Sequence, residues 1–394
     1  MVLLSVNAGS SSLKVSVFDQ ENLNTPRAAV SIEGIGLANA AFIPSGAYGT
    51  DAVREQPIPD TKAATDLIRE WLSSELSIQA SDISAIGHRV VHGGEKYANA
   101  AEIDELLVSY LHSIIPLAPN HMPGTLTAIE AFRQSYPETT HVACFDTSFF
   151  HNLPEVATTF PIPLELQRAN KIRRYGFHGL SYEFLINDFA KNEGEQAAKG
   201  RVIMAHLGSG ASVAACKDGQ PVESSMGFTP VSGIMMSTRS GDLEPGLTRY
   251  LQEQLKMTLK EVSELLTYKS GLLGVSGTTA DMYTLLQTQH DNPDVKLAIE
   301  LFVYKIKKTI GSFAAAMGGV DSIIFSGGIG ERSAEIRARI CNDLEFLGAA
   351  IDDGRNGKSE RRISTDNARV GVYVIPTQED YSIITQTIKI IQNK

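Results

Sequence analysis

The sequence predicts an α/β protein made of two duplicated domains. Strand-like alternation of apolar residues gives way repeatedly to helical spacing, the pattern of α/β folds. Three apolar strands run into glycine-rich turns, within residues 2–19, 201–217 and 322–340, and the first two have the same form. At 394 residues the chain also exceeds the size at which one core keeps growing. Together these observations predict duplicated halves with a ligand between them.

The first half begins with two strands joined by the turn Asn7–Ser12. Apolar residues at helical spacing predict a helix over 61–78, and ISAIGHRVV, residues 83–91, predicts a buried strand. HVACFDTSFF, residues 141–150, predicts a further strand ending on an acid, Asp146. Because an unpaired buried carboxylate is costly, we expect Asp146 to face a cleft or to pair with an arginine.

The second half repeats the opening form in RVIMAHLGSGASVAACK, residues 201–217. SIIFSGGIGERSAEIRARI, residues 322–340, predicts a strand that runs through three glycines into a helix. The last segment, 381–394, predicts an amphipathic helix that could pack on either half. With a boundary near residue 150, the expected domains are 1–150, which helix 381–394 could complete, and 151–380.

Charge and composition exclude several classes of function and partner. The formal net charge is −10 and no Lys/Arg cluster appears, which argues against nucleic acid as a partner but leaves room for a small anion held by a pair of arginines. Three widely spaced cysteines without a C-x-x-C pattern fit a reducing compartment. Because no membrane-span-like run and no signal peptide are evident, we expect a soluble, cytoplasmic protein with no membrane partner.

The glycine turns suit phosphate. Backbone N–H groups in a glycine turn, with serine hydroxyls beside them, form an anion-binding concavity, although each turn alone could be a simple hairpin connection. None matches the P-loop or completes G-x-G-x-x-G. In their order along the chain the three turns resemble the way actin, Hsp70 and sugar kinases hold a nucleotide between duplicated halves.

Two arginines lie among glycines in the segments GHRVVHGGEKY and STRSGDLEPG, as Arg89 and Arg239. An arginine at such a loop suits bidentate capture of a carboxylate or phosphate, and the alternative is a solvent-facing side chain. His88 and His92 would share a strand face, but no H-E-x-x-H glutamate or third ligand lies nearby, so the pattern disfavours a metal role.

Three further histidines lie beside glycine or proline turns, namely His121, His178 and His206. Each could be a buried structural histidine or a member of an anion site, and position alone leaves both interpretations open.

As a set, these residues resemble the acetate kinase family, the acyl-phosphate-forming branch of the actin-like superfamily. The resemblance runs from residue 2 to about 385 through ordered motifs: NAGSSSLK, GHRVVHGGEK, LAPNHMPG, FDTSFF, RYGFHGLS, HLGSGAS, GFTP, TRSGDLEPG, SGLLGVSG, GGIGE and IPTQED. It implies two duplicated actin-like, ribonuclease H-like domains with a nucleotide cleft between them. It also implies a homodimer formed through the second domain.

The resemblance assigns roles position by position. It implies carboxylate and transition-state arginines, a carboxylate that orients them and two phosphoryl contacts: Arg89, Arg239, Asp146, His121 and His178. It implies Mg²⁺ near Asn7 and Glu379. It implies a small acyl pocket at Val91, Asn120, Phe177 and Pro230. It implies phosphate and nucleotide contacts at Ser10, Ser12, Lys14, His206, Gly208, Ser209, Gly210, Ser212, Asp281, Met282, Tyr283, Gly327, Gly328, Ile329, Gly330 and Glu331.

The chain departs from the family pattern at several of these positions. Ser209, Tyr283 and Arg332 replace the usual Asn, Arg and Asn on the nucleotide side, which leaves the donor open between ATP and pyrophosphate. Asn120 and Met122 replace the usual apolar residue and Asn around His121. The choice among acetate, propionate and butyrate is therefore open.

The chemistry of a carboxylate acceptor explains these roles. A carboxylic acid with a pKa of roughly 4 to 5 is already ionised at neutral pH, so its phosphorylation needs no general base and Asp146 should be an orienter. An anionic nucleophile that approaches a phosphoryl group needs positive charge, which two arginines and Mg²⁺ supply. The expected reaction is reversible, Mg²⁺-dependent transfer between ATP and a short-chain carboxylate, giving acyl phosphate and ADP.

Other functions remain as alternatives. Within the same fold these are a propionate kinase or a pyrophosphate-dependent acyl kinase. A sugar or glycerol kinase would need an aspartate base and hydroxyl-binding residues, and an actin-like or Hsp70-like ATPase would use the cleft for switching. Neither of the last two explains the arginine pair.

Overall fold

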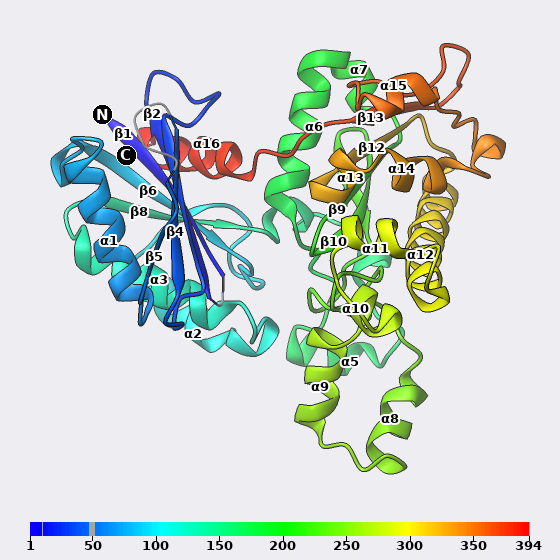
Figure 1. The fold of residues 1–394 in the computed structure, drawn as a ribbon, viewed down its shortest axis with the longest axis horizontal. Coiled ribbons are helices and arrows are strands. Elements are labelled where there is room, and N and C mark those ends of the chain that lie inside the picture. Colours follow the sequence, from blue (N-terminus) through cyan, green and yellow to red (C-terminus); the bar gives the residue numbers. More distant parts are fainter. Residues whose placement is uncertain (10, 47–51, 394) are drawn as a thin grey trace. The chain divides into compact units, whose positions relative to one another are not determined.

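The computed structural model describes residues 1–9, 11–46 and 52–393. Within them the chain forms two compact units (Figure 1). Unit 1 comprises Met1–His151 together with Gln378–Lys394, and unit 2 comprises Asn152–Thr377. The C-terminal helix therefore belongs to the unit that contains the N-terminus.

Unit 1 is built on a sheet whose described strands lie in the order β5-β4-β3-β2-β1-β6-β8-β7. β1 to β5 form an antiparallel meander, whereas β1, β6 and β8 are parallel neighbours. The strands are β1 (Val2–Ala8), β2 (Ser12–Asp19), β3 (Ala28–Glu33), β4 (Ala40–Gly46), β5 (Arg54–Gln56), β6 (Ile83–Val90), β7 (Ala101–Glu102) and β8 (Thr140–Phe145).

Helices cover both faces of this sheet. They are α1 (Thr61–Ser74), α2 (Glu105–Ser113), α3 (Met122–Ser135) and α16 (Glu379–Gln392), with 3₁₀ turns at Ala80–Asp82, Ile115–Leu117 and Ser148–Phe150. On one face, Trp71 of α1 and Phe132 of α3 join the core formed by alternating strand residues such as Val6 and Val15. Burial of this apolar face is the main source of stability for the unit.

Helix α16 covers the opposite face, against β1, β6 and β8 (Figure 1). Its Ile384 packs on Leu3 and Phe18. At Gly87 of β6 any Cβ atom would overlap the α16 side chains of Thr387 and Ile383, so glycine permits the close approach of the helix. The predicted C-terminal helix is thus confirmed, and it packs on the first half of the chain.

Two predicted boundaries in unit 1 are wrong. The helix expected over 61–78 ends at Ser74, because Ser77 adopts a left-handed φ of 55° that cannot continue a right-handed helix. The strand expected over 141–150 ends at Phe145, after which the chain turns into a short 3₁₀ segment. Asp146 therefore follows the strand directly.

The sheet of unit 2 has the order β11-β10-β9-β12-β13. Its strands are β9 (Val202–Leu207), β10 (Ala211–Lys217), β11 (Gln220–Ser224), β12 (Ser322–Ser326) and β13 (Gly371–Val374). β9, β10 and β11 are antiparallel, and β9, β12 and β13 are parallel. This order and these directions repeat β3-β2-β1-β6-β8 of unit 1, so the predicted duplication is confirmed.

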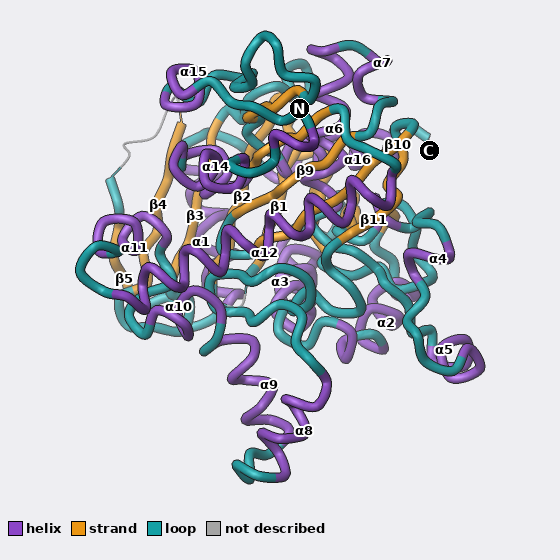
Figure 2. Tube along the Cα trace, turned by 90° about the vertical axis from the view of Figure 1, so that its right-hand side faces the viewer, coloured by secondary structure: helices purple, strands orange, loops and turns teal. Residues whose placement is uncertain are grey.

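The helices of unit 2 fall into short connections around one long helix. They are α4 (Glu155–Thr158), α5 (Leu164–Asn170), α6 (Gly179–Glu193), α7 (Glu195–Ala198), α8 (Pro245–Glu253), α9 (Leu259–Tyr268), α10 (Gly271–Ser276), α11 (Met282–Thr288), α12 (Pro293–Met317), α13 (Gly327–Arg332), α14 (Ala334–Cys341) and α15 (Asp353–Gly357), with a 3₁₀ turn at Glu345–Leu347. Figure 2 shows α12 as the long helix, with α8 and α9 projecting at the lower end of the view. Among the described residues, no helix has the length and apolar character needed to cross a membrane.

Candidate active site

Three polar side chains of unit 1 meet at the carboxyl ends of parallel strands. Asn7 lies near the end of β1, Arg89 near the end of β6, and Asp146 directly after β8. Because these strands are parallel neighbours in the order β1-β6-β8, their ends lie side by side. Carboxyl ends of strands in open α/β sheets are the usual place for a ligand site.

Arg89 and Asp146 form a tight ion pair. Nε of Arg89 donates to both carboxylate oxygens of Asp146 at 3.1 Å, and Nη2 donates to Oδ2 at 2.6 Å. The Asp146 side chain is only 2% exposed, whereas that of Arg89 is 20% exposed. The carboxylate is therefore committed to holding the guanidinium, which still reaches the surface of the unit.

The electrostatics of this pair favour a permanent cation. Burial lowers the pKa of Arg89, but the charges of Asp146 and Glu379 and the hydrogen bonds that Arg89 donates to Asp146 outweigh it and raise that pKa above its ordinary value. Breaking such a buried pair by removing one partner typically costs about 3 to 5 kcal/mol. The arrangement thus holds one oriented positive charge at the edge of the sheet, as the interpretation of Asp146 as an orienter requires.

Asn7 and Glu379 lie beside the same guanidinium. Nη1 of Arg89 donates to Oδ1 of Asn7 at 3.4 Å and lies 3.5 Å from Oε2 of Glu379. An amide oxygen and a carboxylate are hard oxygen donors of the kind that Mg²⁺ binds, with water as the remaining ligands. The donor set therefore fits Mg²⁺, although the described residues hold no cluster of three or more His, Cys, Asp or Glu side chains suited to a metal.

The remaining residues expected on the phosphate side of unit 1 lie in the opening hairpin. Lys14 is exposed on β2 and lies directly opposite Asn7 in the antiparallel ladder, so the two side chains share a face. Ser12 begins β2, and its carbonyl accepts the Gly9 N–H at 2.8 Å. Ser10 lies outside the described residues.

Helix α16 places Glu379 at this site. The next residue, Asp380, accepts hydrogen bonds from Ser5 at 2.6 Å and from Ser16 at 2.8 Å. Both serines are buried polar residues on β1 and β2, beneath the helix. Their hydroxyls fix the first turn of α16 and with it the position of Glu379.

The other predicted residues of unit 1 lie around this edge or in the turn before α3. Val91 follows β6 and is buried. Asn120 and His121 are both half-buried and directly precede α3, with His121 at its N-cap position, and Met122 begins the helix and is fully buried.

His88 and His92 have structural partners. Nε2 of His88 lies 2.9 Å from Nδ1 of the buried His141, and burial lowers the pKa of both groups below the ordinary range. Nδ1 of His92 accepts the Gly94 N–H at 2.8 Å, and burial lowers the pKa of His92 to about 4. Both histidines therefore take part in hydrogen bonds within unit 1.

Unit 2 contains a cavity of about 930 Å³, a size typical of small-molecule sites. Predicted nucleotide residues on its wall are Gly208, Ser209, Gly210, Asp281, Met282, Tyr283, Gly328 and Ile329. The wall also includes Ser237, Thr238, Arg239, Ala280, Leu286, Gln287, Arg332, Ser333, Ala334 and Glu335. The cavity therefore joins the second and third glycine turns, which lie far apart in the sequence, to the loop that carries Arg239.

Two acidic residues expected at the nucleotide shape the loops around this cavity. Asp281 caps α11 by accepting from the Thr284 N–H at 2.9 Å and from its hydroxyl at 2.7 Å, and these bonds lower the pKa of Asp281. Oε1 of Glu331 accepts the N–H groups of Gly327 at 2.9 Å and Thr377 at 3.1 Å. Gly327 itself has φ +75°, and a Cβ there would overlap the backbone of Leu207.

Behind the second glycine turn lie two stacked histidines. The rings of His178 and His206 are 4.5 Å apart at 29°. A Cβ atom added to Gly210 would lie 3.2 Å from Nε2 of His178 and 3.8 Å from Nη1 of Arg239, so both side chains face this glycine. His178 itself has φ 59°, a left-handed backbone conformation that is uncommon outside glycine and concentrates at functional sites.

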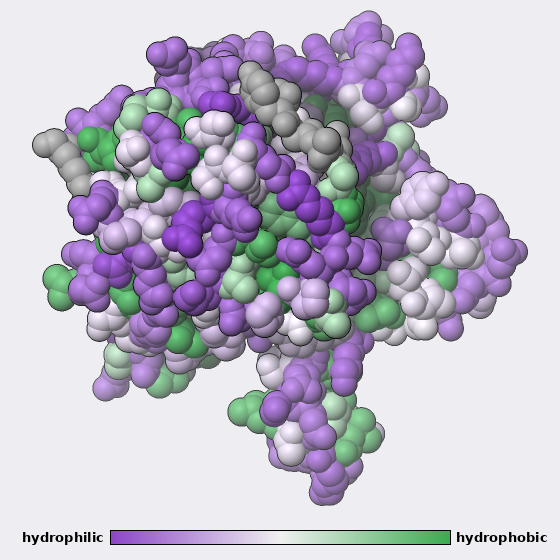
Figure 3. Space-filling view, turned by 60° about the vertical axis from the view of Figure 1, so that its left-hand side comes forward, coloured by the Kyte–Doolittle hydropathy of each residue, from purple (hydrophilic) through white to green (hydrophobic). Residues whose placement is uncertain are grey.

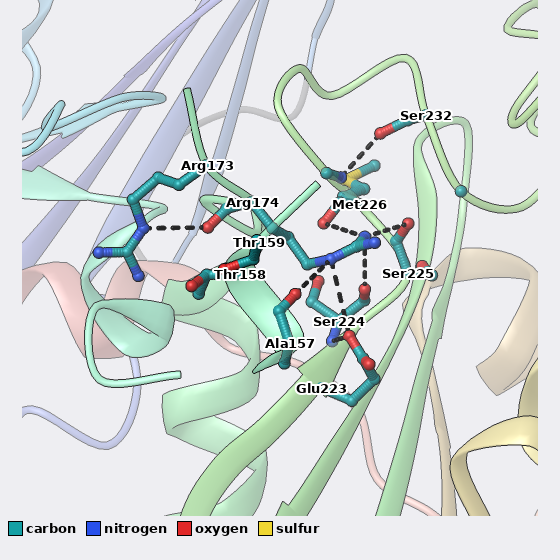
Figure 4. Close-up of polar contacts among 12 residues, drawn as sticks. Ala157, Thr158, Thr159, Arg173, Arg174, Glu223, Ser224, Ser225, Met226 and Ser232 are labelled. Atoms are coloured by element: carbon teal, nitrogen blue, oxygen red, sulfur yellow. Dashed lines mark hydrogen bonds and ion pairs between the residues drawn. The ribbon is translucent and has the colours of Figure 1, made fainter. Parts of the chain in front are cut away.

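The segment that carries Phe177 and His178 is anchored by Arg174 (Figure 4). The Arg174 guanidinium donates to the carbonyls of Ala157 at 3.1 Å and Ser224 at 3.0 Å, and it pairs with Glu223 at 3.7 Å. One guanidinium thereby joins the chain before His178 to the end of β11.

Arg239 and Pro230 are in direct contact. Nη1 of Arg239 donates to the Pro230 carbonyl at 3.0 Å. Pro230 is buried, as is Phe177, and Arg239 is half-buried on the cavity wall. Unit 2 therefore brings the predicted transition-state arginine beside one of the predicted acyl-pocket residues.

Three residues of this region were not predicted from the sequence. Ser181, Tyr182 and Thr377 contact the histidine pair or its partners through their hydroxyls. Ser181 and Tyr182 follow His178 at helical spacing, which is a signal for side chains that share its face of a helix. Ser212 was expected at the nucleotide, but it is fully buried with its hydroxyl between His178 and Tyr182.

The duplicated fold, the oriented arginines and the cavity of unit 2 define a class of phosphoryl-transfer enzymes with two actin-like domains. Residues 2–385 match the model of the Acetokinase family, and the chain belongs to this family. It is 40% identical to an acetate kinase of Rhodopseudomonas palustris, over 97% of this chain and 96% of that protein. It is 39% identical to an acetate kinase of Clostridium botulinum, over 98% of each.

Solved structures show the same likeness over 99% of both chains. The acetate kinase of Porphyromonas gingivalis has a TM-score of 0.90 at 36% identity. A propionate kinase of Francisella tularensis has a TM-score of 0.93 at 33% identity.

Proposed function

We propose that this chain is an acetate kinase, which transfers the γ-phosphoryl group of ATP reversibly to acetate and yields acetyl phosphate and ADP. Its membership of the Acetokinase family supports this assignment. The structural observation that carries it is the ion pair of Arg89 and Asp146. A buried carboxylate whose two oxygens both bind one guanidinium orients a cation, and it does not accept a proton from a substrate hydroxyl.

The acceptor follows from that geometry. A sugar kinase needs a carboxylate free to take the hydroxyl proton, whereas an acetate ion is already deprotonated and needs a positive charge to bring it to the phosphoryl group. Arg89 supplies such a charge from unit 1 and Arg239 supplies another from unit 2. Both would bind the anionic reactants and stabilise the charge that develops during transfer.

The donor proposed here is ATP. The cavity of unit 2 has apolar walls at Met282, Leu286 and Ile329, beside polar groups such as Ser237 and Thr238. Apolar surface of this kind suits a nucleoside, and pyrophosphate would leave it uncovered. Ser209, Tyr283 and Arg332, which depart from the family pattern, lie on the same wall. We therefore expect any difference in donor preference to concern the base and the ribose.

Mg²⁺ is the cofactor that this reaction requires. Asn7 and Glu379 would hold it, with water as the other ligands, and it would neutralise charge on the phosphate oxygens. Lys14, on the same sheet face as Asn7, would bind the phosphates, as would the hydroxyl of Ser12.

The acceptor site would be small. Val91 and Phe177 are buried apolar residues that offer contact to a methyl group, and Pro230 adds a rigid surface beside Arg239. The half-buried amide of Asn120 would reduce apolar contact for a longer chain. Each further methylene gains up to about 0.8 kcal/mol only where it is buried against carbon, so we propose acetate over propionate and butyrate.

An acceptor panel tests the proposal. Purified protein, ATP and Mg²⁺ are incubated with acetate, propionate, butyrate, glucose or no acceptor, and ADP and hydroxylamine-trapped acyl phosphate are both measured. We expect both products with acetate, less with propionate and little with butyrate. ADP formation with glucose, or equal ADP formation without any acceptor, would contradict the proposal.

We also propose that the enzyme is a homodimer of the cytoplasm. Exposed apolar side chains gather on α8 and α9, including Leu247, Tyr250 and Leu259, and Figure 3 shows apolar surface on the lobe at the bottom of the view. Such a surface supports a role in association. Light scattering should give twice the chain mass of 42.6 kDa.

Three buried cysteines that form no disulfide among the described residues suit a reducing compartment.

A further inference from the structure

The stacked histidines of unit 2 have hydroxyl groups bonded to their Nδ1 atoms. Nδ1 of His178 lies 2.9 Å from the Ser212 hydroxyl, and Nδ1 of His206 lies 2.8 Å from the Ser181 hydroxyl. Both serines are fully buried. A neutral imidazole carries one proton on either Nδ1 or Nε2, and the bond at one nitrogen decides the state of the other.

Tyr182, Ser212 and His178 form a first chain of hydrogen bonds, and its protons can be assigned starting from Tyr182. Tyr182 is fully buried, and burial raises the pKa of its hydroxyl, so the group keeps its proton. The Tyr182 hydroxyl oxygen lies 2.6 Å from the Ser212 hydroxyl oxygen, and a buried hydroxyl proton needs an acceptor within such a distance. We therefore assign the Tyr182 proton to the bond with Ser212.

The Ser212 hydroxyl then needs an acceptor for its own proton, and Nδ1 of His178 is within hydrogen-bond distance. If Nδ1 of His178 carried a proton, the Ser212 oxygen would face donors on both sides, and its own buried proton would meet no acceptor in either. Leaving a buried polar group unsatisfied costs roughly 1 to 3 kcal/mol. The lower-energy arrangement has Ser212 donating to Nδ1, so His178 carries its proton on Nε2.

Thr377, Ser181 and His206 form a second chain of hydrogen bonds, and its protons also point toward the histidine. Thr377 donates its hydroxyl proton to Ser181 at 2.8 Å. Ser181 in turn lies 2.8 Å from Nδ1 of His206, which becomes the acceptor for the serine proton. Nε2 of His206 then carries the imidazole proton.

Both Nε2 atoms face the same turn. A Cβ atom on Gly210 would lie 3.2 Å from Nε2 of His178, and one on Gly208 would lie 3.9 Å from Nε2 of His206. This turn lines the cavity of unit 2. Two neutral rings can stack at 4.5 Å without the repulsion that two imidazolium ions would suffer.

We propose that the two buried hydroxyl chains hold both histidines as neutral imidazoles whose Nε2–H groups point to the second glycine turn as a fixed pair of hydrogen-bond donors. The inference rests on the proposed function for the identity of the ligand, which is the transferring phosphoryl group of the donor. Tyr182, Ser212, Ser181 and Thr377 are positioning residues, because they act through the rings. Donors fixed before the substrate binds need no reorganisation during transfer.

Nitrogen NMR of the unliganded protein with isotope-labelled histidine tests the proposal without any turnover. His178→Gln and His206→Gln identify the two sets of signals. We expect Nδ1 of both residues to show the shift of an unprotonated nitrogen and Nε2 that of a protonated one at neutral pH. A protonated Nδ1 on either ring in the wild-type protein would overturn the proposal.

Two variants then separate the chains. Tyr182→Phe should move His178 toward a mixture of tautomers and leave His206 unchanged, and Thr377→Val should do the reverse. Tyr182→Phe should also lower kcat roughly three- to tenfold, the equivalent of one hydrogen bond, with little change in the KM for acetate. Unchanged tautomers in both variants, or an effect on KM alone, would contradict the positioning role.

Tyr373→Phe is the matched control. Tyr373 is a buried tyrosine of the same unit, on β13, and its ring packs on Phe189. Its variant should leave both the tautomers and kcat unchanged. If the expected tautomers are found in a protein that fails to phosphorylate acetate, the proposed function fails while the assignment of the protons stands.

Discussion

At the scale of single residues, Asp146 separates a carboxylate kinase from a hydroxyl kinase. The side chain is 2% exposed, and both of its oxygens accept from Arg89. A general base would instead point one oxygen toward the substrate. The chemistry of the site therefore depends on which proton, if any, this carboxylate has to take.

We predict that Asp146→Asn lowers kcat/KM for acetate about 10- to 100-fold, because Arg89 loses its charged anchor. The shape of the pH profile between about pH 6 and pH 8 should stay the same, since no group that gains a proton during catalysis is removed. Steady-state kinetics over that range check both points. Loss of activity that is rescued at high pH would identify Asp146 as a base.

In the proposed reaction, Arg239 supplies the second positive charge. Removing it by Arg239→Ala should lower kcat/KM by about 100-fold or more, because charge neutralisation in the transition state is worth on the order of 3 kcal/mol. The side chain is half-buried and donates to a carbonyl, so the variant should fold with a similar thermal midpoint. Arg249→Ala, on the exposed face of α8, is the control, and an Arg239→Ala enzyme with wild-type kinetics would refute the assignment.

Glu379 is expected to act through the metal ion. We predict that Glu379→Ala raises the Mg²⁺ concentration for half-maximal rate at least tenfold, because one anionic donor is lost. A magnesium titration at saturating ATP measures this. An unchanged titration curve would show that Glu379 serves only Arg89.

At the scale of elements, the buried histidines of unit 1 link its stability to pH. Burial depresses the pKa of His88 and His141, and it lowers that of His92 to about 4, from an ordinary 6.5. The native state therefore keeps these rings neutral, while the unfolded chain binds protons below about pH 6.5. Because the unfolded state then holds more protons, the free energy of unfolding falls as pH falls.

We predict that each such histidine lowers the free energy of unfolding by about 1.4 kcal/mol per pH unit below about pH 6.5. Trp71, the single tryptophan of the sequence, is buried in the core of unit 1 and reports its unfolding by fluorescence. Urea titrations between about pH 7.5 and pH 5.5 give the slope, which His92→Gln should reduce. A slope of opposite sign would contradict the prediction.

The sequence was most informative where a pattern is local. The strand–turn–strand hairpins, the buried strand β6 and the C-terminal helix follow from alternation or helical spacing, and the structure confirms them. Element ends were less predictable. The end of α1 depends on the left-handed backbone at Ser77, which no apolar spacing reveals.

The hydrogen-bond and ion-pair partners of the site residues could be identified only from the fold. A predicted arginine partner for Asp146 follows from the cost of a buried charge, but its identity as Arg89 depends on β6 and β8 being neighbours. The hydroxyl chain through Ser181 and Thr377 joins residues far apart in the sequence, so no local pattern could indicate it.

At the scale of the whole molecule, two copies of one sheet present different functional groups. The first copy presents an arginine, an amide and carboxylates at its parallel strand ends, and the second presents the cavity and the histidine pair. The reaction that we propose would draw on groups from both units.

The central claim is that an oxygen atom of acetate attacks the γ-phosphorus of ATP. Phosphorus NMR of the products formed from acetate labelled with the heavy oxygen isotope tests it most directly. The account predicts acetyl phosphate whose phosphorus signal carries the isotope shift of one labelled bridging oxygen, together with ADP. Inorganic phosphate as the sole phosphorus product beside ADP, or acetyl phosphate without the isotope shift, would contradict it.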